Sequence, residues 1–222
     1  MEHLVCMKLF LLLSAIVFLS CSSDDIYRPA KKKAGNISVQ SARINCNYFK
    51  YKNDCKNLVI KYQAAPDRET KQALLKFIRD SLFTCWLGTP WDFNGTTEEP
   101  GNGKIACGYF VTTVLRDMGV KVNRIQHAQC PSEEMIKAVC VSNSIKRFSN
   151  QNIPAFIEKI NEYGEGLYIV GLDFHTGFIL NDGDETYFVH ANYAGKKMVE
   201  KEIAVESIVL SNSKYKVIGR VI

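Results

Sequence analysis

The sequence is short of several features, and each shortage narrows the possible functions. None of its apolar runs reaches the roughly 18 residues that a membrane-spanning helix needs, so we expect no such helix. Lys and Arg number 28 against 23 Asp and Glu, a net charge of only +5, and the excess is spread along the chain. Nucleic-acid-binding proteins gather basic residues into a dense patch, so nothing here calls for nucleic acid as a partner. The chain is nevertheless 46% hydrophobic and 11% aromatic, which excludes a disordered protein and suits one globular domain with a small appendage.

The first residues are typical of a targeting segment. Leu9–Leu19 is apolar or small except for one serine, which predicts a signal peptide over residues 1–20. The end of this segment, Phe18-Leu19-Ser20-Cys21, resembles the lipobox of bacterial lipoproteins and implies a diacylglycerol on the thiol of Cys21. The alternative is an ordinary cleaved signal with an incidental cysteine. Residues 21–36 are typical of a flexible tether. We therefore expect a lipid-anchored protein of the cell envelope, periplasmic or surface-exposed at the outer membrane, that touches the membrane only through its lipid.

The eight cysteines fit an oxidising compartment. Two of them belong to the leader and the lipid site, Cys6 and Cys21. Local bridges between Cys46 and Cys55 and between Cys130 and Cys140 are our prediction, although spacing alone does not fix the connectivity. Two cysteines then remain, Cys85 and Cys107. They either form a third bridge or include a reactive thiol.

The periodicity of apolar residues predicts helices in the first half of the chain and strands in the second. After an N-terminal extension over residues 37–66, Asp67 is expected to cap a helix that runs to about Phe83. Residues 88–104 are rich in glycine and should form an irregular loop. The other expected helices cover 107–118, 132–140 and 154–163. The expected strands cover 167–172, 176–180, 186–191, 198–203 and 215–222. This order predicts an α+β domain over residues 67–222, with helices packed on an antiparallel β-sheet.

Cys107 is the first residue with a chemical signature. It follows the glycine-rich loop Gly101-Asn102-Gly103 and opens an apolar helix. Unpaired backbone N–H groups and the helix dipole favour an anion at that place, so we expect the pKa of the Cys107 thiol to be lowered. The alternative is a small buried hydrophobic residue that begins a core helix.

Two of the four histidines lie in the strand-rich half, on either side of a turn signal at Asp182-Gly183. A two-residue hairpin turn there would place His175 directly opposite His190 on the neighbouring strand. In the same register Gly177 faces Phe188, and Asp173 faces Asn192. One sheet face would then gather four polar side chains, Asp173, His175, His190 and Asn192. A longer loop would shift this register.

A cysteine at a helix start and a pair of strand histidines are the groups that a thiol hydrolase needs. The sequence resembles the NlpC-type peptidoglycan cysteine peptidases, a bacterial branch of the papain-like superfamily, over about residues 68–222. The matching segments are Leu87-Gly88-Thr89-Pro90-Trp91-Asp92-Phe93-Asn94-Gly95, Ile105-Ala106-Cys107-Gly108-Tyr109-Phe110-Val111, Asn123-Arg124, Gln129, Gly164-Glu165-Gly166-Leu167, His175-Thr176-Gly177-Phe178-Ile179 and Phe188-Val189-His190-Ala191.

The resemblance implies a papain-like fold with the nucleophile at a helix N-terminus. It implies Cys107 as nucleophile, His175 as general base and His190 as the group that orients it, with Trp91 and Asp92 in the oxyanion and substrate-binding region. It implies no cofactor and no metal. The implied activity is hydrolysis of an amide bond in peptidoglycan stem peptides, between D-γ-glutamyl and a diamino acid, by a protein that we expect to be a monomer.

The chain departs from the family at several positions. Ala106, Gly108 and Tyr109 stand where the family has Asp, Ser and Gly, and Trp91 replaces a tyrosine that assists the oxyanion. The segment between Gln129 and Gly164 is also longer than in the family. The alternatives are the same fold acting on another amide or as an acyl transferase, and a degenerate module that binds wall fragments without cutting them. A metal site built from Cys107, His175, His190 and Asp173 is a further alternative, although their spacing is nonspecific.

Overall fold

The structure is a computed structural model, and it describes residues 46–222. The predictions for the signal peptide, for Cys21 and for the tether over residues 21–36 fall outside this range and stay predictions.

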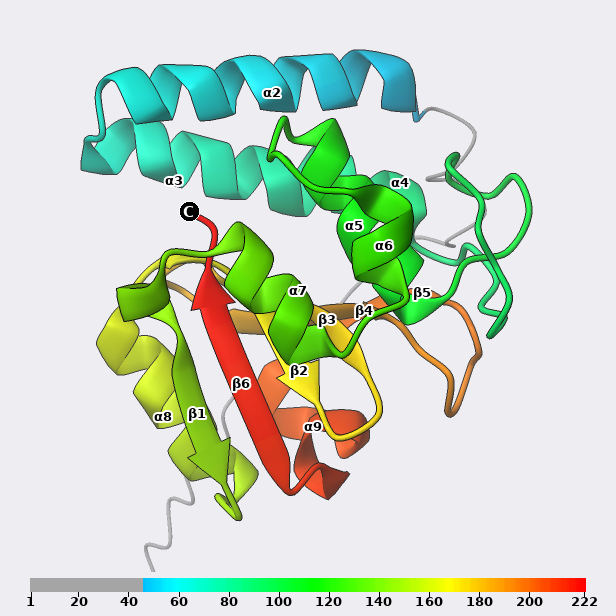
Figure 1. Ribbon diagram of the computed structural model, residues 1–222. Helices are drawn as coiled ribbons and strands as arrows, with labels where there is room; N and C mark the ends of the chain where they lie inside the picture. Colours follow the sequence, from blue (N-terminus) through cyan, green and yellow to red (C-terminus); the bar gives the residue numbers. More distant parts are fainter. Residues whose placement is uncertain (1–45) are drawn as a thin grey trace, which may run out of the picture. The chain divides into compact units, whose positions relative to one another are not determined.

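An antiparallel six-stranded sheet forms the centre of the protein, in the order β1-β6-β2-β3-β4-β5 (Figure 1). The strands are β1 Lys146–Ser149, β2 Gly166–Leu172, β3 Thr176–Asn181, β4 Thr186–Ala191, β5 Val199–Ile203 and β6 Tyr215–Arg220. Together with the helices, this sheet confirms the predicted α+β class and the predicted antiparallel pairing.

Helices cover the sheet on both faces. The longer α-helices are α2 Tyr48–Ala64, α3 Arg68–Phe77, α5 Cys107–Asp117, α7 Ser132–Val139 and α8 Ile153–Tyr163. The short ones are α4 Phe83–Trp86, α6 Arg124–Ala128 and α9 Ile208–Asn212, together with a π-turn at Ile78–Leu82 and 3₁₀ turns at Ser142–Ser144 and Ala204–Glu206. Figure 1 shows α2 and α3 side by side, and α5, α6 and α7 in front of the strands.

The two faces of the sheet carry two separate hydrophobic cores because side chains alternate along each strand. In β2, Leu167 and Ile169 pack in the larger core with α3, α5 and α7, whereas Tyr168 and Val170 pack in the smaller core with α8 and α9. Burying both faces explains why β2 is apolar throughout, without the alternation of a half-exposed strand.

The predicted helix that starts after Asp67 is present, but it is divided. The Asp67 carboxylate accepts a hydrogen bond from the N–H of Thr70 at 2.8 Å, which satisfies one of the free N–H groups of the first turn. The helical path then continues through the π-turn into α4 as far as Trp86. The N-terminal extension is also more ordered than predicted, since it holds the long helix α2.

The predicted disulfides are wrong. The structure joins Cys46, just before α2, to Cys85 in α4, and the other four described cysteines are free thiols: Cys55, Cys107, Cys130 and Cys140. The bridge therefore ties the start of the N-terminal helix to the main domain, and Cys107 is not consumed in a disulfide.

The predicted hairpin register is also wrong, by two residues. Residues 182–185 form the turn between β3 and β4, with Asp182 donating its N–H to the carbonyl of Glu185 at 3.2 Å. Phe188 consequently pairs with Ile179 rather than with Gly177. A shift of two residues leaves every side chain on its predicted sheet face, because side chains alternate with a period of two. His175 and His190 therefore share a face, but they are diagonal rather than directly opposite.

No helix among residues 46–222 combines the length and the apolar character that crossing a membrane requires.

Candidate active site

Cys107 occupies the first position of α5, as predicted. Ala106 precedes it with an extended backbone and offers no side-chain cap, so the first N–H groups of the helix stay available near the thiol. Its neighbour Gly108 has a steric reason to be glycine, since an added Cβ would lie 2.2 Å from the carbonyl oxygen of Ala128. The close approach of α6 to α5 thus accounts for glycine at position 108.

His175 and His190 form a buried pair. The Nε2 of His175 lies 2.8 Å from the Nδ1 of His190, and the two rings meet edge to face. Gly177 in β3 leaves room for the His190 side chain, since an added Cβ at Gly177 would lie 2.8 Å from the Cβ of His190. The ring of His190 also stacks on Phe188, with centroids 4.0 Å apart. The predicted histidine pair is therefore present and rigidly held.

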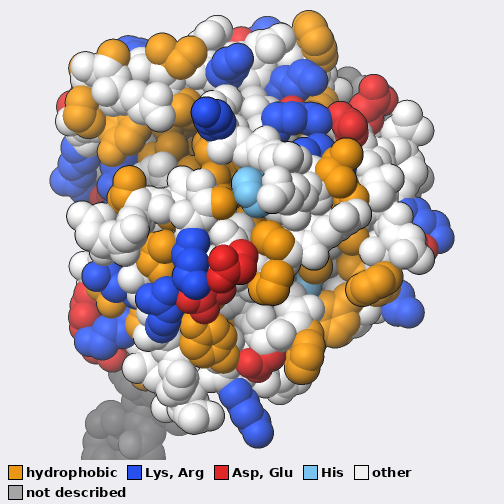
Figure 2. Space-filling model, in the orientation of Figure 1, with side chains coloured by type: hydrophobic (Ala, Val, Ile, Leu, Met, Phe, Trp, Pro, Cys, Tyr) orange, Lys and Arg blue, Asp and Glu red, His pale blue; other side chains and the backbone are white. Residues whose placement is uncertain are grey.

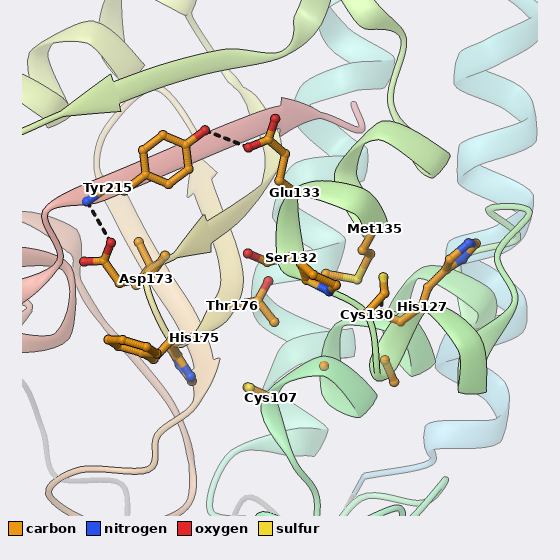
Figure 3. Close-up of a pocket in the computed structure, with 15 residues that line it drawn as sticks. Cys107, His127, Cys130, Ser132, Glu133, Met135, Asp173, His175, Thr176 and Tyr215 are labelled. Atoms are coloured by element: carbon orange, nitrogen blue, oxygen red, sulfur yellow. Dashed lines mark hydrogen bonds between the residues drawn. The ribbon is translucent and has the colours of Figure 1, made fainter.

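His175 and Cys107 line a common cavity. Figure 3 shows the His175 ring and the Cys107 sulfur pointing toward one another from the start of β3 and the start of α5. Within the described part of the chain, the Nδ1 of His175 is buried and has no hydrogen-bond partner. The backbone N–H of Thr176, the next residue, contacts the Cys107 sulfur. A thiol and an imidazole nitrogen thus share one site.

The resting charges differ from the prediction. Burial raises the pKa of the Cys107 thiol above its ordinary value, although the N–H groups of Thr176, Gly108 and Cys107 itself act in the opposite direction. Burial, assisted by the nearby His190, lowers the pKa of His175 well below its ordinary 6.5. The expectation of a lowered thiol pKa is therefore wrong for this structure, because loss of hydration outweighs the helix start. At neutral pH the pair is a thiol beside a neutral imidazole.

A carboxylate completes the row of polar groups, and the sequence analysis missed it. The Nε2 of His190 lies 3.3 Å from Glu202 and 3.8 Å from Glu200, both on β5. Burial alone would raise the pKa of Glu202, but the nearby His190 and Ser207 hold it below its ordinary value. The spacing of two glutamates along one strand is a signal that could have found them, but only with the β4–β5 register, which pairs His190 with Glu200.

Two of the four groups expected on the histidine face bind elsewhere. Asp173 accepts the N–H groups of Lys214 and Tyr215 at 2.7 and 3.2 Å, so its carboxylate holds the segment before β6. Asn192 donates to Glu200 and accepts the N–H of Ala194 at 2.8 Å. Neither contacts the imidazole pair through a hydrogen bond, so they are not part of the row that leads to Cys107.

The two loop residues expected near the oxyanion have different positions. Trp91 lines the same cavity as Cys107, and its ring lies 6.3 Å from that of Tyr193. Asp92 does not line that cavity, since its carboxylate accepts the N–H of Asn94 at 2.9 Å and pairs with Lys104 at 3.0 Å. The structure therefore brings Trp91 to the site and leaves Asp92 beside it as a loop-stabilising group.

The described residues do not gather the metal ligands considered above. The one group with suitable ligand atoms within 4.8 Å of one another is His190 with Glu200 and Glu202, and it excludes Cys107 and Asp173. A cation there would bind the Nε2 of His190, the atom that lies nearest Glu202.

Two cavities meet at Cys107 and His175. The first, which we call the acidic cavity, measures about 430 Å³ and includes Glu133 and Asp173 among its lining residues (Figure 3). The second, which we call the aromatic cavity, measures about 640 Å³ and is lined by Trp91, Phe93, Tyr109, Phe174 and Tyr193. The thiol and the imidazole thus line both cavities.

The row Cys107, His175, His190 and Glu202 can perform nucleophilic catalysis. An imidazole can accept the thiol proton, the second imidazole can hold the first in its reactive tautomer, and the carboxylate can do the same for the second. The function of this site has to be argued from its own geometry, since the chain matches no family model, no curated protein and no solved structure.

Proposed function

We propose that this protein is a cysteine hydrolase of the cell envelope, with a papain-like fold of the NlpC type, that cleaves an amide bond in peptidoglycan stem peptides. The bond that the family resemblance indicates is the one between D-γ-glutamyl and a diamino acid. The observation that carries the proposal is that Cys107 and His175 line the same cavities, while the buried Nδ1 of His175 has no hydrogen-bond partner among residues 46–222 and the Nε2 of the same ring lies 2.8 Å from His190.

In the proposed reaction, Cys107 attacks the carbonyl carbon of the substrate amide and passes its proton to the Nδ1 of His175. Because both groups are neutral at rest, this transfer creates two opposite charges within the site. The N–H groups of Cys107, Gly108 and Thr176 lie close enough to the sulfur to favour its negative charge. The imidazolium donates its Nε2–H to His190, whose own Nε2 lies 3.3 Å from Glu202.

The remaining steps use the same groups. The oxyanion of the tetrahedral intermediate would be held by backbone N–H groups of the first turn of α5, with the indole N–H of Trp91 as a further donor. His175 then protonates the leaving amine, and the C–N bond breaks to leave a thioester on Cys107. Water, deprotonated by His175, hydrolyses the thioester and restores the free thiol.

The test is mass spectrometry of purified muropeptides incubated with the wild-type protein and with Cys107→Ser. We expect the wild type to convert muropeptides into two smaller fragments, and the mass of each fragment identifies the bond. Serine lacks a readily ionised group, so turnover should fall by orders of magnitude while muropeptide binding persists.

The raised pKa of Cys107 favours one alternative, a degenerate module that binds wall fragments without cutting them. In that case wild type and Cys107→Ser would bind muropeptides equally and leave their masses unchanged. A third result, new amides in place of free acids when an amine is supplied, would identify an acyl transferase of the same fold.

A further inference from the structure

The aromatic cavity has a composition that points to a particular class of ligand. Five aromatic side chains line it, and among the described residues it contains no Asp, Glu, Lys or Arg and no Leu, Ile, Val or Met. Its polar lining consists of the neutral groups of Asn94, Thr96 and Gln129 besides the catalytic pair. Its volume of about 640 Å³ lies within the range of roughly 300 to 1,000 Å³ typical of ligand pockets.

Two of the aromatic side chains are exposed to an unusual degree. Phe93 is 80% exposed and Phe174 is 94% exposed, although both are large apolar groups. In Figure 2 hydrophobic side chains gather to the right of centre, over the region where Figure 1 places α5, α6 and the ends of β3 and β4. Exposed aromatic side chains beside a catalytic pair are typical of a ligand-binding surface.

The walls of the cavity are held in place before any ligand binds. The guanidinium of Arg124 lies over the Tyr109 ring, 4.8 Å from its centroid, and donates to Thr113 at 2.8 Å and to the carbonyl of Thr96 at 2.7 Å. Gln129 donates to the Tyr109 hydroxyl at 2.9 Å. Arg124 is therefore engaged with the wall, and its charge is not offered to a ligand carboxylate.

The acidic cavity on the other side of the cysteine has a different composition. Glu133 accepts hydrogen bonds from Tyr215 and Arg147, both at 2.7 Å, and these contacts lower its pKa to about 2. Asp173 is the second carboxylate there, bound to backbone N–H groups. The two halves of the groove thus differ in composition: one is lined by aromatic and neutral side chains, and the other contains two carboxylates that are already bound by protein donors.

Resting on the function proposed above, we propose that the aromatic cavity binds the uncharged amino sugar of a muropeptide, the N-acetylmuramyl group. This sugar is neutral because its single carboxyl group is consumed in the amide bond to the stem peptide. A pyranose ring presents flat C–H faces that pack on aromatic rings, while its hydroxyl and acetamido groups bond to amide and hydroxyl side chains. A fatty acyl chain would instead favour branched aliphatic walls, which the described lining of this cavity does not provide.

The test compares three matched probes on the full chain carrying Cys107→Ser, which prevents turnover. The probes are N-acetylmuramyl-L-alanyl-D-isoglutamine, the sugar-free N-acetyl-L-alanyl-D-isoglutamine, and N-octanoyl-L-alanyl-D-isoglutamine. All three keep an amide at the alanine nitrogen, so they differ only in the group beyond it. Isothermal titration calorimetry should give a Kd at least tenfold lower for the muramyl probe than for either of the other two.

Single variants in the same background locate the effect. Phe93→Ala and Phe174→Ala should each bring the muramyl Kd closer to that of the sugar-free probe and leave the latter unchanged. Phe49→Ala is the matched control, since Phe49 is a 71% exposed phenylalanine on α2 that does not line the cavity. It should change none of the three values.

Equal affinity for the muramyl and sugar-free probes would overturn the inference. Tighter binding of the octanoyl probe would also overturn it, as would a muramyl preference that Phe93→Ala and Phe174→Ala leave unchanged. These outcomes are independent of the proposed catalysis. A wild-type protein that cleaves muropeptides without any muramyl preference loses the sugar site and keeps the hydrolase function. A protein that prefers the muramyl probe but does not cleave muropeptides would keep the sugar site and lose the hydrolase function.

Discussion

At the scale of single residues, the positions of two protons decide whether His175 can act as a base. For its Nδ1 to accept the Cys107 proton, neutral His175 must carry its own proton on Nε2. That N–H then donates to the Nδ1 of His190 across 2.8 Å, and His190 must carry its proton on Nε2. The carboxylate of Glu202 lies 3.3 Å from that atom and favours this arrangement. In the proposed mechanism Glu202 would therefore act as a positioning residue through both imidazoles.

Replacing Glu202 should reduce kcat without a matching change in KM. Glu202→Met removes the acceptor but keeps the length of the side chain, and we expect kcat to fall at least tenfold, yet less than the roughly 10⁴-fold loss known for a group that touches the catalytic imidazole directly. KM should stay similar because Glu202 lines neither cavity. The measurement is steady-state cleavage of a muropeptide across pH 5 to 9.

Two control variants separate this role from simple destabilisation. Glu202→Gln keeps an acceptor oxygen and should restore most of the activity lost in Glu202→Met. Glu200→Gln should have the smaller effect, because Glu200 lies farther from His190 and is already engaged by Asn192 and Lys196. Equal losses in all three variants would contradict a tautomer role for Glu202.

The rate at which Cys107 is alkylated at each pH should show that its thiol is protonated at neutral pH. Because burial raises the thiol pKa, iodoacetamide should label Cys107 slowly below pH 8 and progressively faster at alkaline pH, where the thiolate forms. Labelling has to be assigned by peptide mapping, since Cys130 is also a half-buried free thiol with a raised pKa. Fast labelling of Cys107 already at pH 6 would show instead that thiolate and imidazolium coexist at rest.

At the scale of helices and strands, the sequence predicted those elements whose signal is local. Patterns within a few residues predicted Asp67 as a cap and Cys107 as a helix start. Such patterns also predicted the apolar strands β2, β3, β4 and β6. The β3–β4 register was missed because Asp182 binds its own turn through its side chain, accepting the N–H groups of Asp184 and Glu185, and so favours a longer loop than Asp182-Gly183 suggests.

Elements whose stability depends on distant partners were not predicted. Strand β1 has a short, mostly polar sequence, and its pairing with β6 is what holds it in the sheet. Helix α2 buries only Cys55 and Val59 completely and has no strong apolar stripe, so its sequence alone gives little sign of a helix. Its attachment comes from the Cys46–Cys85 bridge and from Tyr48, whose hydroxyl donates to Asp117 at 2.9 Å.

Removing the Cys46–Cys85 bridge should therefore loosen α2 and lower the stability of the domain. The bridge spans 39 residues of sequence, for which the chain-entropy model gives about 4 kcal/mol. Urea unfolding of Cys46→Ser/Cys85→Ser should show a loss of about this size relative to the oxidised wild type. Reducing agent should destabilise the wild type and leave the double variant unchanged; an equal response in both would contradict the observed pairing.

At the scale of the whole molecule, the site exists because separate parts of the fold converge. Cys107 comes from a helix that packs in the larger core, whereas His190 shares a sheet face with Phe188 in the smaller one. The sequence identified Cys107, His175 and His190 because each stands in a short recognisable segment. No such pattern marks Glu202, Phe174 or Tyr193. The register of β4 with β5 brings Glu202 near the histidine pair, and loops bring Phe174 and Tyr193 to the cavity beside it.

The buried histidine makes the stability of the whole domain sensitive to acid. Well above pH 6.5 His175 is neutral in both the folded and the unfolded chain and contributes no pH dependence. As the pH falls below 6.5, His175 becomes protonated in the unfolded chain but stays neutral in the folded protein, because burial and His190 hold its pKa well below the ordinary value. Stability should therefore decrease between pH 6.5 and 5 by up to about 1.4 kcal/mol per pH unit for this one group.

Urea unfolding of the wild type and of His175→Gln at pH 7.5, 6.5, 5.5 and 5.0 measures this effect. Glutamine is similar in reach and does not titrate, so the variant should lose less stability than the wild type over the same range, whatever its stability at pH 7.5. Carboxylates with a lowered pKa, such as Glu133 at about 2, also stabilise the folded protein. This stabilisation is lost mainly below pH 5, and it is lost equally in both proteins. Parallel curves for the two proteins would mean that His175 binds its proton as readily in the folded protein as in the unfolded chain, which would require the imidazole to be hydrated rather than enclosed between Cys107 and His190.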